Sequence, residues 1–345
     1  MRALTLTAPR GIDALEVGDV PEPVIAHADE VRIRVAAAAI NRLDLMLTGG
    51  LPGVSLVLPH IVGTDAAGTV ESVGPGVTAF APGDRVMVNP GISCGRCDAC
   101  LSGDQPLCDR FGILGEHRAG TAAEFLVVPS ANVARVPDGM GWAQAAAFSL
   151  ATLTSWRMLV TRARVRPGET VLVWGAGGGV AQASIAVAHL MGARVIAASG
   201  SDAKLEVARR LGAAHLVNHA TQDLVAEVKR ITGRRGADVV VDSVGEASWP
   251  RSLRCLARAG RLVTCGATTG PMVGIDVRKL FWHQWSILGS TMGSHAEYAA
   301  IVELASRGAL WPVVDRVVPL AESAEVYRRM AANEQVGKLV IEVAA

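Results

Sequence analysis

Four cysteines lie close together in the chain, and their spacing points to a metal ion. Cys94, Cys97, Cys100 and Cys108 follow the pattern C-x2-C-x2-C-x7-C. Four thiolates complete the tetrahedral shell of Zn²⁺ and leave no position open, so such a site stabilises a loop and performs no chemistry. A bacterial ferredoxin cluster has a shorter last gap followed by proline, whereas Asp109 stands here. The short gaps also strain disulfide pairing. We therefore expect one structural Zn²⁺ per chain.

A second stretch has the composition of a phosphate-binding turn. The apolar run Val171–Trp174 is followed by five residues that we assign to a cofactor: Gly175, Gly177, Gly178, Gly179 and Val180. A pyrophosphate can approach backbone N–H groups at the start of a helix only where no Cβ blocks it. Glycine also occurs in turns that bind nothing, but this turn connects a strand to a helix, which favours a dinucleotide site.

The residues after the next expected strand bear on the choice of cofactor. NAD enzymes usually carry Asp or Glu at that point, where the carboxylate binds the ribose 2′-hydroxyl. This chain has Ser199, Ser201 and Lys204 there, which can hold a 2′-phosphate. We interpret the nearby Asp202 as the N-cap of the following helix. The sequence therefore favours NADPH over NADH, although the two serines could be ordinary loop residues and the lysine a solvated charge.

The elements that must position these residues differ between the two parts of the chain. Before about residue 140, period-two runs such as Glu30–Val35 alternate with Gly/Pro turns, which predicts a β-barrel-like fold. A long helix is expected over Ala143–Val160. Strands and helices then alternate in the pattern of a doubly wound parallel sheet: strands 171–174, 194–198, 215–217, 239–241, 261–265 and 286–289, with helices 180–191, 203–211, 223–231 and 247–257.

Composition limits the class of protein and its partners. A chain of 345 residues exceeds the usual size of one core, so two domains are expected. The formal charge of +1, with both signs interspersed, gives no indication of nucleic-acid binding. Apolar stretches are too short to span a bilayer, and the N-terminus lacks a signal-peptide pattern. These features predict a cytoplasmic protein with a small-molecule substrate, no nucleic-acid partner and no membrane association.

Motifs along nearly the whole chain resemble the medium-chain dehydrogenase/reductase superfamily, which includes the zinc-type alcohol dehydrogenases. The cysteine spacing is the most specific of them. Five further motifs carry the resemblance: Gly63–Gly74, Pro82–Val86, Arg166–Val171, Asp242–Gly245 and Gly260–Gly266. The resemblance implies a GroES-like β-barrel catalytic domain over 1–149 and 293–345, with a zinc lobe at about 90–112, and a Rossmann domain, a doubly wound parallel sheet, over 150–292. The last fifty residues, including a strand at Lys338–Val343, should pack onto the N-terminal domain.

The same resemblance suggests further roles. Thr154 and Lys338 resemble positions near the nicotinamide and the phosphates, and Gly266 and Thr268 resemble the loop that touches the nicotinamide. Members of this family often pair the edge strands of two sheets, so a homodimer or homotetramer is expected. The aromatic stretch Leu280–Trp285 is then core or dimer surface, or alternatively a wall of the substrate pocket.

The departures from the family concern the catalytic zinc. At the three places where zinc alcohol dehydrogenases carry its ligands, this chain has Asn41, Thr64 and, less securely aligned, Leu150, which are poor zinc ligands. Asn41-x-x-Asp44 and Gly-x-Asp are similar to the quinone oxidoreductase branch, whose members usually lack the four-cysteine lobe. The resemblance thus implies an NADPH-dependent reductase of quinones, enones or enoyl thioesters without catalytic zinc.

Catalytic roles and alternatives follow from these departures. Asn41 would donate a hydrogen bond to the substrate carbonyl, while Asp44 and Thr64 would orient the substrate or carry protons. The alternative is purely structural: Asn41 caps the backbone, and Asp44 and Asp65 are capping residues as well. Two other functions stay open at this point: an alcohol dehydrogenase whose zinc uses His60, Asp44 or Asp65, and an NADPH-binding protein without turnover.

Overall fold

The computed structural model describes residues 1–343, and the chain divides into two compact units. Unit 1 combines Met1–Ala151 with Gly293–Ala345, and unit 2 is Thr152–Met292. The division expected from the sequence, at 149/150 and 292/293, lies within two residues of these bounds. None of the helices in the described part of the chain is both long and apolar enough to cross a membrane.

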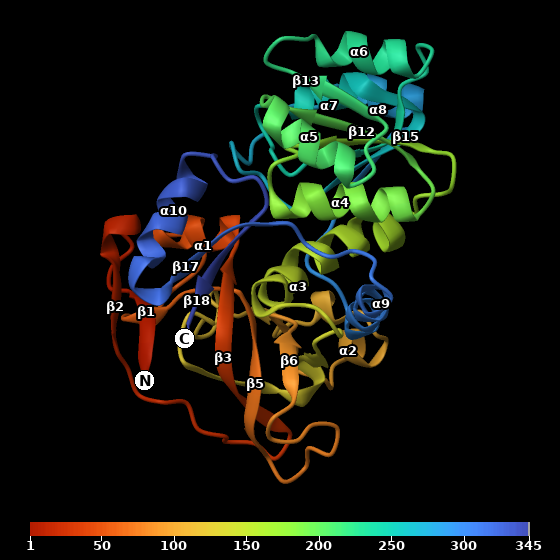
Figure 1. The fold of residues 1–345 in the computed structure, drawn as a ribbon. Helices are drawn as coiled ribbons and strands as arrows, with labels where there is room; N and C mark the ends of the chain where they lie inside the picture. The colour runs from red at the N-terminus through yellow and green to blue at the C-terminus, as the bar shows by residue number, and fades with distance from the viewer. Residues whose placement is uncertain (344–345) are drawn as a thin grey trace. The chain divides into compact units, whose positions relative to one another are not determined.

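Unit 1 is built mainly from antiparallel strands (Figure 1). One sheet has the order β2-β1-β4, and a second has the order β10-β6-β5-β3-β18-β17 with β9 also paired to β3. The strands are β1 Arg2–Leu6, β2 Leu15–Asp19, β3 Glu30–Ile40, β4 His60–Ile61, β5 Asp65–Val73, β6 Arg85–Val88, β9 Phe125–Pro129, β10 Val133–Arg135, β17 Val314–Pro319 and β18 Lys338–Glu342. The predicted β-rich N-terminal part is confirmed.

Strand β3 organises this unit because it pairs on both sides. Val31, Ile33 and Val35 are fully buried and alternate with more exposed residues, as the period of two predicted. Beyond them, every residue from Ala37 to Ile40 is buried. Along that second half, β3 lies between β5 and β18. The C-terminal strand therefore completes the N-terminal sheet, as expected.

Helices and a small lobe complete unit 1. Its helices are α1 Arg42–Thr48, α2 Asp98–Leu101, α9 His295–Ser306 and α10 Ser323–Ala331, and most of α3 Trp142–Trp156 also belongs to it. The cysteine lobe contains α2 and the 3-10 turn Gln105–Leu107, and the hairpin of β7 Gly91–Ile92 with β8 Gly112–Ile113 closes its base. The helix expected over Ala143–Val160 is regular only to Trp156 and continues as a π-helix over Arg157–Arg162.

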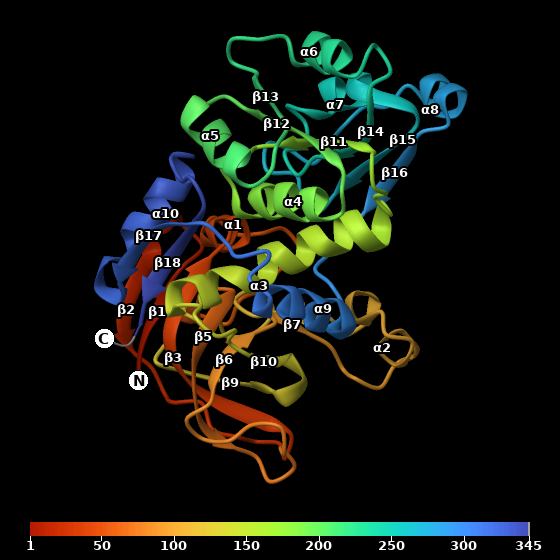
Figure 2. The same cartoon turned by 45° about the vertical axis from the view of Figure 1, so that its right-hand side comes forward.

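Unit 2 is a six-stranded parallel sheet with the order β13-β12-β11-β14-β15-β16 (Figure 2). Its strands are β11 Thr170–Trp174, β12 Arg194–Ser199, β13 His215–Asn218, β14 Ala237–Val241, β15 Leu256–Thr264 and β16 Ser286–Gly289. Its helices are α4 Gly179–Leu190, α5 Asp202–Arg210, α6 Leu224–Ile231, α7 Trp249–Cys255 and α8 Val277–His283. This strand order is that of the doubly wound dinucleotide-binding sheet, which reverses between β11 and β14.

The packing of unit 2 explains why its strands are continuous apolar runs. All five residues of β11 are buried, because helices cover both faces of a parallel sheet. The face covered by α6 and α7 holds a core that includes Leu172, Trp174 and Val228. Two predicted bounds are wrong at one junction: β15 begins at Leu256, five residues before the expected start at 261, and the helix expected to reach 257 ends at Cys255. Its early part pairs with β14 only through a shift of register.

Candidate active site and zinc lobe

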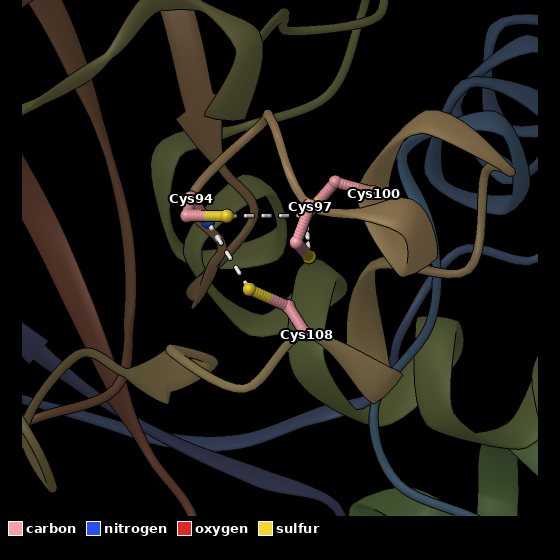
Figure 3. A group of neighbouring side chains, drawn as sticks. All are labelled: Cys94, Cys97, Cys100 and Cys108. Carbon is pink, nitrogen blue, oxygen red and sulfur yellow. Dashed lines mark hydrogen bonds between the residues drawn. The ribbon is translucent and has the colours of Figure 1, made fainter.

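The four cysteines converge in the lobe of unit 1, as Figure 3 shows. Their sulfur atoms all lie within 4.8 Å of one another. The Sγ of Cys100 is 3.9 Å from that of Cys94 and 3.5 Å from that of Cys97. A tetrahedral zinc with bonds of about 2.3 Å would hold sulfurs about 3.8 Å apart. The lobe therefore has the geometry of a closed four-thiolate zinc site.

Backbone N–H groups favour the thiolate form of Cys94, while desolvation and the neighbouring cysteine sulfurs raise the pKa of Cys97 to about 11. Cys108 Sγ accepts hydrogen bonds from the backbone N–H groups of Cys94, at 3.4 Å, and Arg110, at 3.3 Å. Hydrogen bonds from the backbone of Arg96 and Cys97 lower the pKa of Cys94 to about 6. The described cysteines are all free thiols, so no disulfide competes for these sulfurs. The donor set fits Zn²⁺ in a structural role.

The glycine turn in unit 2 leaves the start of α4 open. Gly175 adopts φ +75°, a left-handed conformation that favours glycine. Its N–H donates to the carbonyl of Ala198 at 2.9 Å. Gly178 occupies the N-cap position of α4, which has no side-chain cap, so the first N–H groups of the helix stay available for an anion. The turn has the form that the dinucleotide prediction requires.

Gly177 has a separate reason to be glycine, which the sequence did not reveal. A Cβ at Gly177 would lie 2.5 Å from Cδ of Lys204. The lysine stem from α5 therefore crosses the glycine turn, and a larger residue at Gly177 would have to displace it. Lys204, which the sequence assigned to a 2′-phosphate, thus lies directly beside the predicted phosphate-binding turn.

Ser199 and Ser201 lie at the carboxyl end of β12, as predicted. The Ser201 N–H points to Ser199 Oγ at 3.4 Å, and Ser199 is buried. The interpretation of Asp202 as an N-cap is wrong. Ser201 occupies that position, whereas Asp202 is the first residue of α5 and accepts a hydrogen bond from the Asn218 side chain at 2.7 Å.

His219 is a neighbour of this strand end that the sequence did not single out. Its N–H donates to the Ser199 carbonyl at 3.0 Å, and its ring lies beside Gly200. The same ring is 5.4 Å from the ring of Trp174, over which the Arg251 guanidinium lies at 4.8 Å. Burial and then the charge of Arg251 lower the pKa of His219. Because these contacts join β11, β13 and α7, no local pattern could have indicated them.

The other predicted cofactor residues of unit 2 lie on its remaining loops. Thr268 donates its backbone N–H to the Ser243 carbonyl at 3.3 Å, and Gly266 bonds back to Thr264 Oγ1 at 3.3 Å. Thr154 is buried in α3, with its hydroxyl 3.9 Å from Met292 Sδ. Their contact with a cofactor remains a prediction.

The predicted catalytic residues meet in unit 1 around two buried carboxylates. Thr64 Oγ1 donates to Asp44 Oδ1 at 2.7 Å, and the Asn41 backbone N–H donates to Asp44 Oδ2 at 2.6 Å. The Asn41 side chain instead faces Asp65, to whose Oδ2 its Nδ2 donates at 2.9 Å. Asp65 Oδ1 accepts the backbone N–H of Leu150 at 2.8 Å. Of the three residues that the resemblance placed at zinc-ligand positions, Asn41 and Leu150 thus donate to Asp65, whereas Thr64 donates to Asp44.

Lys338 belongs to the same network, although the sequence placed it near the cofactor phosphates. Its Nζ lies 2.9 Å from Asp65 Oδ2 and 2.5 Å from Asn41 Oδ1, and only 4% of the side chain is exposed. A phosphate contact of Lys338 therefore remains a prediction, and two of its three N–H donors already have partners.

The two carboxyls occupy different electrostatic environments. Complete burial raises the pKa of Asp44 to about 6, despite hydrogen bonds from Thr64 and the Asn41 backbone that lower it. Asp65 has an ammonium partner at ion-pair distance. Carboxyls with environments this different can divide acid–base and structural roles between them.

Comparison with known proteins identifies the family. The family described as "Alcohol dehydrogenase GroES-like domain" matches residues 27–138, and "Zinc-binding dehydrogenase" matches residues 179–307. The chain belongs to the medium-chain dehydrogenase/reductase superfamily. It is thus an NAD(P)-dependent oxidoreductase with a GroES-like domain and a Rossmann domain, as the sequence resemblance implied.

Relatives within this superfamily carry several names. A solved structure titled "NAD-dependent alcohol dehydrogenase" is 45% identical, with a TM-score of 0.96 and complete coverage of both chains. "Alcohol dehydrogenase" of Geobacillus stearothermophilus is 32% identical over 95% of this chain and 96% of its own. "2-haloacrylate reductase" of a Burkholderia species is 30% identical over 90% of both chains.

We predict one zinc per chain in protein purified without added metal, released only when the lobe loses a thiolate. Cys97→Ser should abolish the bound zinc and lower the melting temperature, because the metal ties α2 to the rest of the lobe. Cys265→Ser, at a half-buried cysteine outside the lobe, is the matched control and should retain one zinc. Metal content is measured by plasma emission spectrometry. A second zinc that a chelator removes together with activity would contradict a metal-free active site.

Proposed function

We propose that this enzyme is an NADPH-dependent reductase that transfers hydride to a quinone or an activated C=C bond without a catalytic zinc. The observation that carries the proposal is the set of residues around Asp65. By the family resemblance, an amide, a hydroxyl and, at the less securely aligned position, an aliphatic side chain stand where zinc ligands would be, in Asn41, Thr64 and Leu150. Zinc binds thiolate, imidazole and carboxylate, and none of these three side chains supplies one.

Other ligands for a catalytic zinc find little support. The alternative set of His60, Asp44 and Asp65 has its polar atoms in other bonds, since His60 Nε2 lies 2.8 Å from the Gly115 carbonyl. In residues 1–343, the four lobe cysteines are the one group of three or more His, Cys, Asp or Glu whose ligand atoms converge. A reaction that needs no Lewis acid is therefore favoured.

Asn41 is suited to bind the carbonyl oxygen of the acceptor. Within the described chain, its Nδ2 has one hydrogen bond, to Asp65, which leaves one of its two hydrogens to donate. When bound, NADPH supplies the hydride. The amide would stabilise the negative charge that develops on the acceptor oxygen, in a buried setting where such a bond is stronger than in water.

Asp44 and Thr64 form a path for the proton that completes the reduction. Asp44 Oδ2 accepts the Asn41 N–H, so the proton of a neutral Asp44 must be on Oδ1, which faces Thr64. Protonation would reverse that hydrogen bond and make the Thr64 hydroxyl an acceptor. The Thr64 hydrogen would then be free to move to the substrate while Asp44 replaces it.

Oxidation of an alcohol is the competing function. It is favoured by the names of the "NAD-dependent alcohol dehydrogenase" structure and the Geobacillus protein. The "2-haloacrylate reductase" name supports the proposal, because 2-haloacrylate contains a C=C bond activated by a carboxylate. Assays of NADPH oxidation with quinones and enones, beside alcohol-dependent NADP reduction, separate the two functions.

The preference for NADPH is also part of the proposal. No carboxylate ends β12, where Ser199 and Ser201 stand, and Lys204 crosses the glycine turn. These groups favour a 2′-phosphate over a bare ribose hydroxyl. We further propose a cytoplasmic location, since a four-thiolate zinc site needs a reducing compartment.

The assembly that we propose is a homodimer, or a homotetramer made from such dimers. Strand β16 is an edge of the parallel sheet, so its outer backbone groups can pair with a second copy across a two-fold axis. Beside it in sequence, α8 exposes Phe281 and Trp282 by 65% and 67%. The core interpretation of the stretch is wrong for these two aromatics, which are exposed in the single chain, and is supported for Trp285, which packs against the core of unit 2.

We predict that enone reduction declines as the pH rises above about 6, the pKa of Asp44. The protonated Asp44 carboxyl, which donates the proton, is fully populated well below pH 6. Its population falls about tenfold for each pH unit above the pKa. Thr64→Val should lower kcat about 100-fold by breaking the path. Thr48→Val is the control, because its buried hydroxyl donates only to the Leu45 carbonyl in α1. A flat pH profile together with full activity of Thr64→Val would contradict the proton path from Asp44 through Thr64.

We predict that Lys204→Ala raises the KM for NADPH about tenfold and leaves the KM for NADH unchanged, because a charge-assisted bond to the 2′-phosphate is lost. Lys229→Ala, at an exposed lysine of α6, is the matched control. Steady-state kinetics with both cofactors measure the effect. An equal loss for NADPH and NADH would place the lysine on the shared pyrophosphate, and a preference of the unmodified enzyme for NADH would overturn the cofactor choice.

We predict a dimer in sedimentation-velocity experiments and its dissociation by Trp282→Lys. A charge placed on the α8 surface must be desolvated when the second copy binds. Val57→Lys changes an apolar residue of unit 1 that is 86% exposed, and it should leave the dimer intact. If the unmodified protein sediments as a monomer, or the lysine variant as a dimer, the α8–β16 surface is not the interface.

A further inference from the structure

The Asn41 side chain has one orientation that its neighbours allow. An ammonium can only donate hydrogen bonds and a carboxylate can only accept them. Oδ1 of Asn41 must therefore face Lys338, and Nδ2 must face Asp65, as the distances of 2.5 and 2.9 Å show. A flipped amide would set its N–H group against the ammonium and its oxygen against the carboxylate. Lys338 and Asp65 thus fix the orientation of the Asn41 amide from its two ends.

This arrangement of Asn41, Asp65 and Lys338 is rigid because the three residues lie at the ends of three adjacent strands. Asn41 follows the last residue of β3, Asp65 begins β5 and Lys338 begins β18. In the sheet, Ala39 pairs with Asp65 and Ile40 pairs with Leu339, which brings the three strand ends into one row. The Leu150 N–H holds the remaining carboxylate oxygen. Asp65 and Lys338 are fixed by strand pairing as well as by side-chain contacts, and the Asn41 backbone N–H is held by Asp44 Oδ2.

The contact with Lys338 also changes the strength of Asn41 as a hydrogen-bond donor. A positive charge at the amide oxygen withdraws electrons through the conjugated C–N bond and makes the N–H group more acidic. Such polarisation along a hydrogen-bond chain is strongest where solvent is absent, and Lys338 is 4% and Asp65 0% exposed. The second N–H of the Asn41 amide is therefore held in a fixed orientation and made a stronger donor by Lys338, which need not touch the substrate.

We propose that Lys338 is a positioning residue that acts on the acceptor carbonyl through Asn41, with Asp65 as the counter-charge that sets the amide. The inference rests on the proposed function, in which Asn41 binds that carbonyl. It differs from the role that the sequence suggested for Lys338, a contact with cofactor phosphates. The two roles predict different measurements.

The test is a double-mutant cycle on the full-length enzyme. Lys338→Met should lower kcat for an enone about 30-fold, less than the roughly 100- to 1000-fold loss when an oxyanion donor itself is removed, because Asn41 remains, with the Kd for NADPH changed less than twofold. In the Asn41→Ala variant, adding Lys338→Met should lower kcat by less than a further twofold, because Lys338 acts through the amide that this variant lacks. Lys338→Arg, which keeps a donor and a charge, should recover part of the rate. Multiplicative losses, or a tenfold rise in the Kd for NADPH, would overturn the proposal.

Two additions keep the outcome decisive. If Lys338→Met alone does not fold, because it leaves Asp65 buried without its partner, Asp65→Asn/Lys338→Met removes both charges and replaces it in the cycle. The cycle is also run on binding, as the Kd of cyclohexenone for the enzyme–NADP⁺ complex, which cannot turn over. If the unmodified enzyme oxidises alcohols and reduces no enone, the proposed function fails. The coupling between Lys338 and Asn41 is then measured on that reaction and still decides the role of the lysine.

Discussion

The candidate active site of this enzyme depends on the ion pair between Asp65 and Lys338. A carboxylate removed from water loses several kcal/mol of hydration unless charges and hydrogen bonds replace it. Asp65 is fully buried and receives three donors, one each from Lys338, Asn41 and the Leu150 backbone. These donors come from β18, the end of β3 and α3. The strand order β5-β3-β18 is therefore a requirement of the site as well as a feature of the fold.

The pair also explains how two neighbouring buried carboxyls, those of Asp44 and Asp65, can have different roles. Asp65 is paired with the Lys338 ammonium and accepts a hydrogen bond from the Asn41 side chain, so it sets the orientation of that amide. Asp44 receives hydrogen bonds from Thr64 and the Asn41 backbone, and its burial raises its pKa to about 6. One carboxyl is thus fixed as a structural acceptor, and the other can exchange a proton near neutral pH. Both contact Asn41, through its side chain and its backbone respectively.

Local patterns in the sequence were enough to predict much of this architecture. The parallel strands of unit 2 are short apolar runs with turn signals, and the strand Ser286–Gly289 has the predicted bounds. The cysteine spacing predicted a cluster because all four residues belong to one loop. The misplacement of Asp202 has a local cause, since Ser201 and Asp202 are both good cap residues and only the backbone path selects between them.

The active-site network could not be predicted, because it joins residues 41, 65 and 338 through the register of separate strands. A shift of one residue in β18 would turn Lys338 to the other face of the sheet. The same limit applies to His219 and to Lys204 over Gly177, which meet their neighbours only after the sheet has formed. Residue types indicated which groups could act, whereas long-range register determines which of them meet.

The ion pair limits the chemistry that the site can support. A zinc ion brings net positive charge to the substrate oxygen and can stabilise an alkoxide directly. Lys338 and Asp65 form an ion pair whose charges offset each other, so in the proposed mechanism they would offer the oxygen only a polarised N–H group through Asn41. That is sufficient where the transition-state charge is spread over a conjugated system, as in an enolate or a hydroquinone anion. A localised alkoxide would need more, and this electrostatic difference favours conjugated acceptors over simple alcohols.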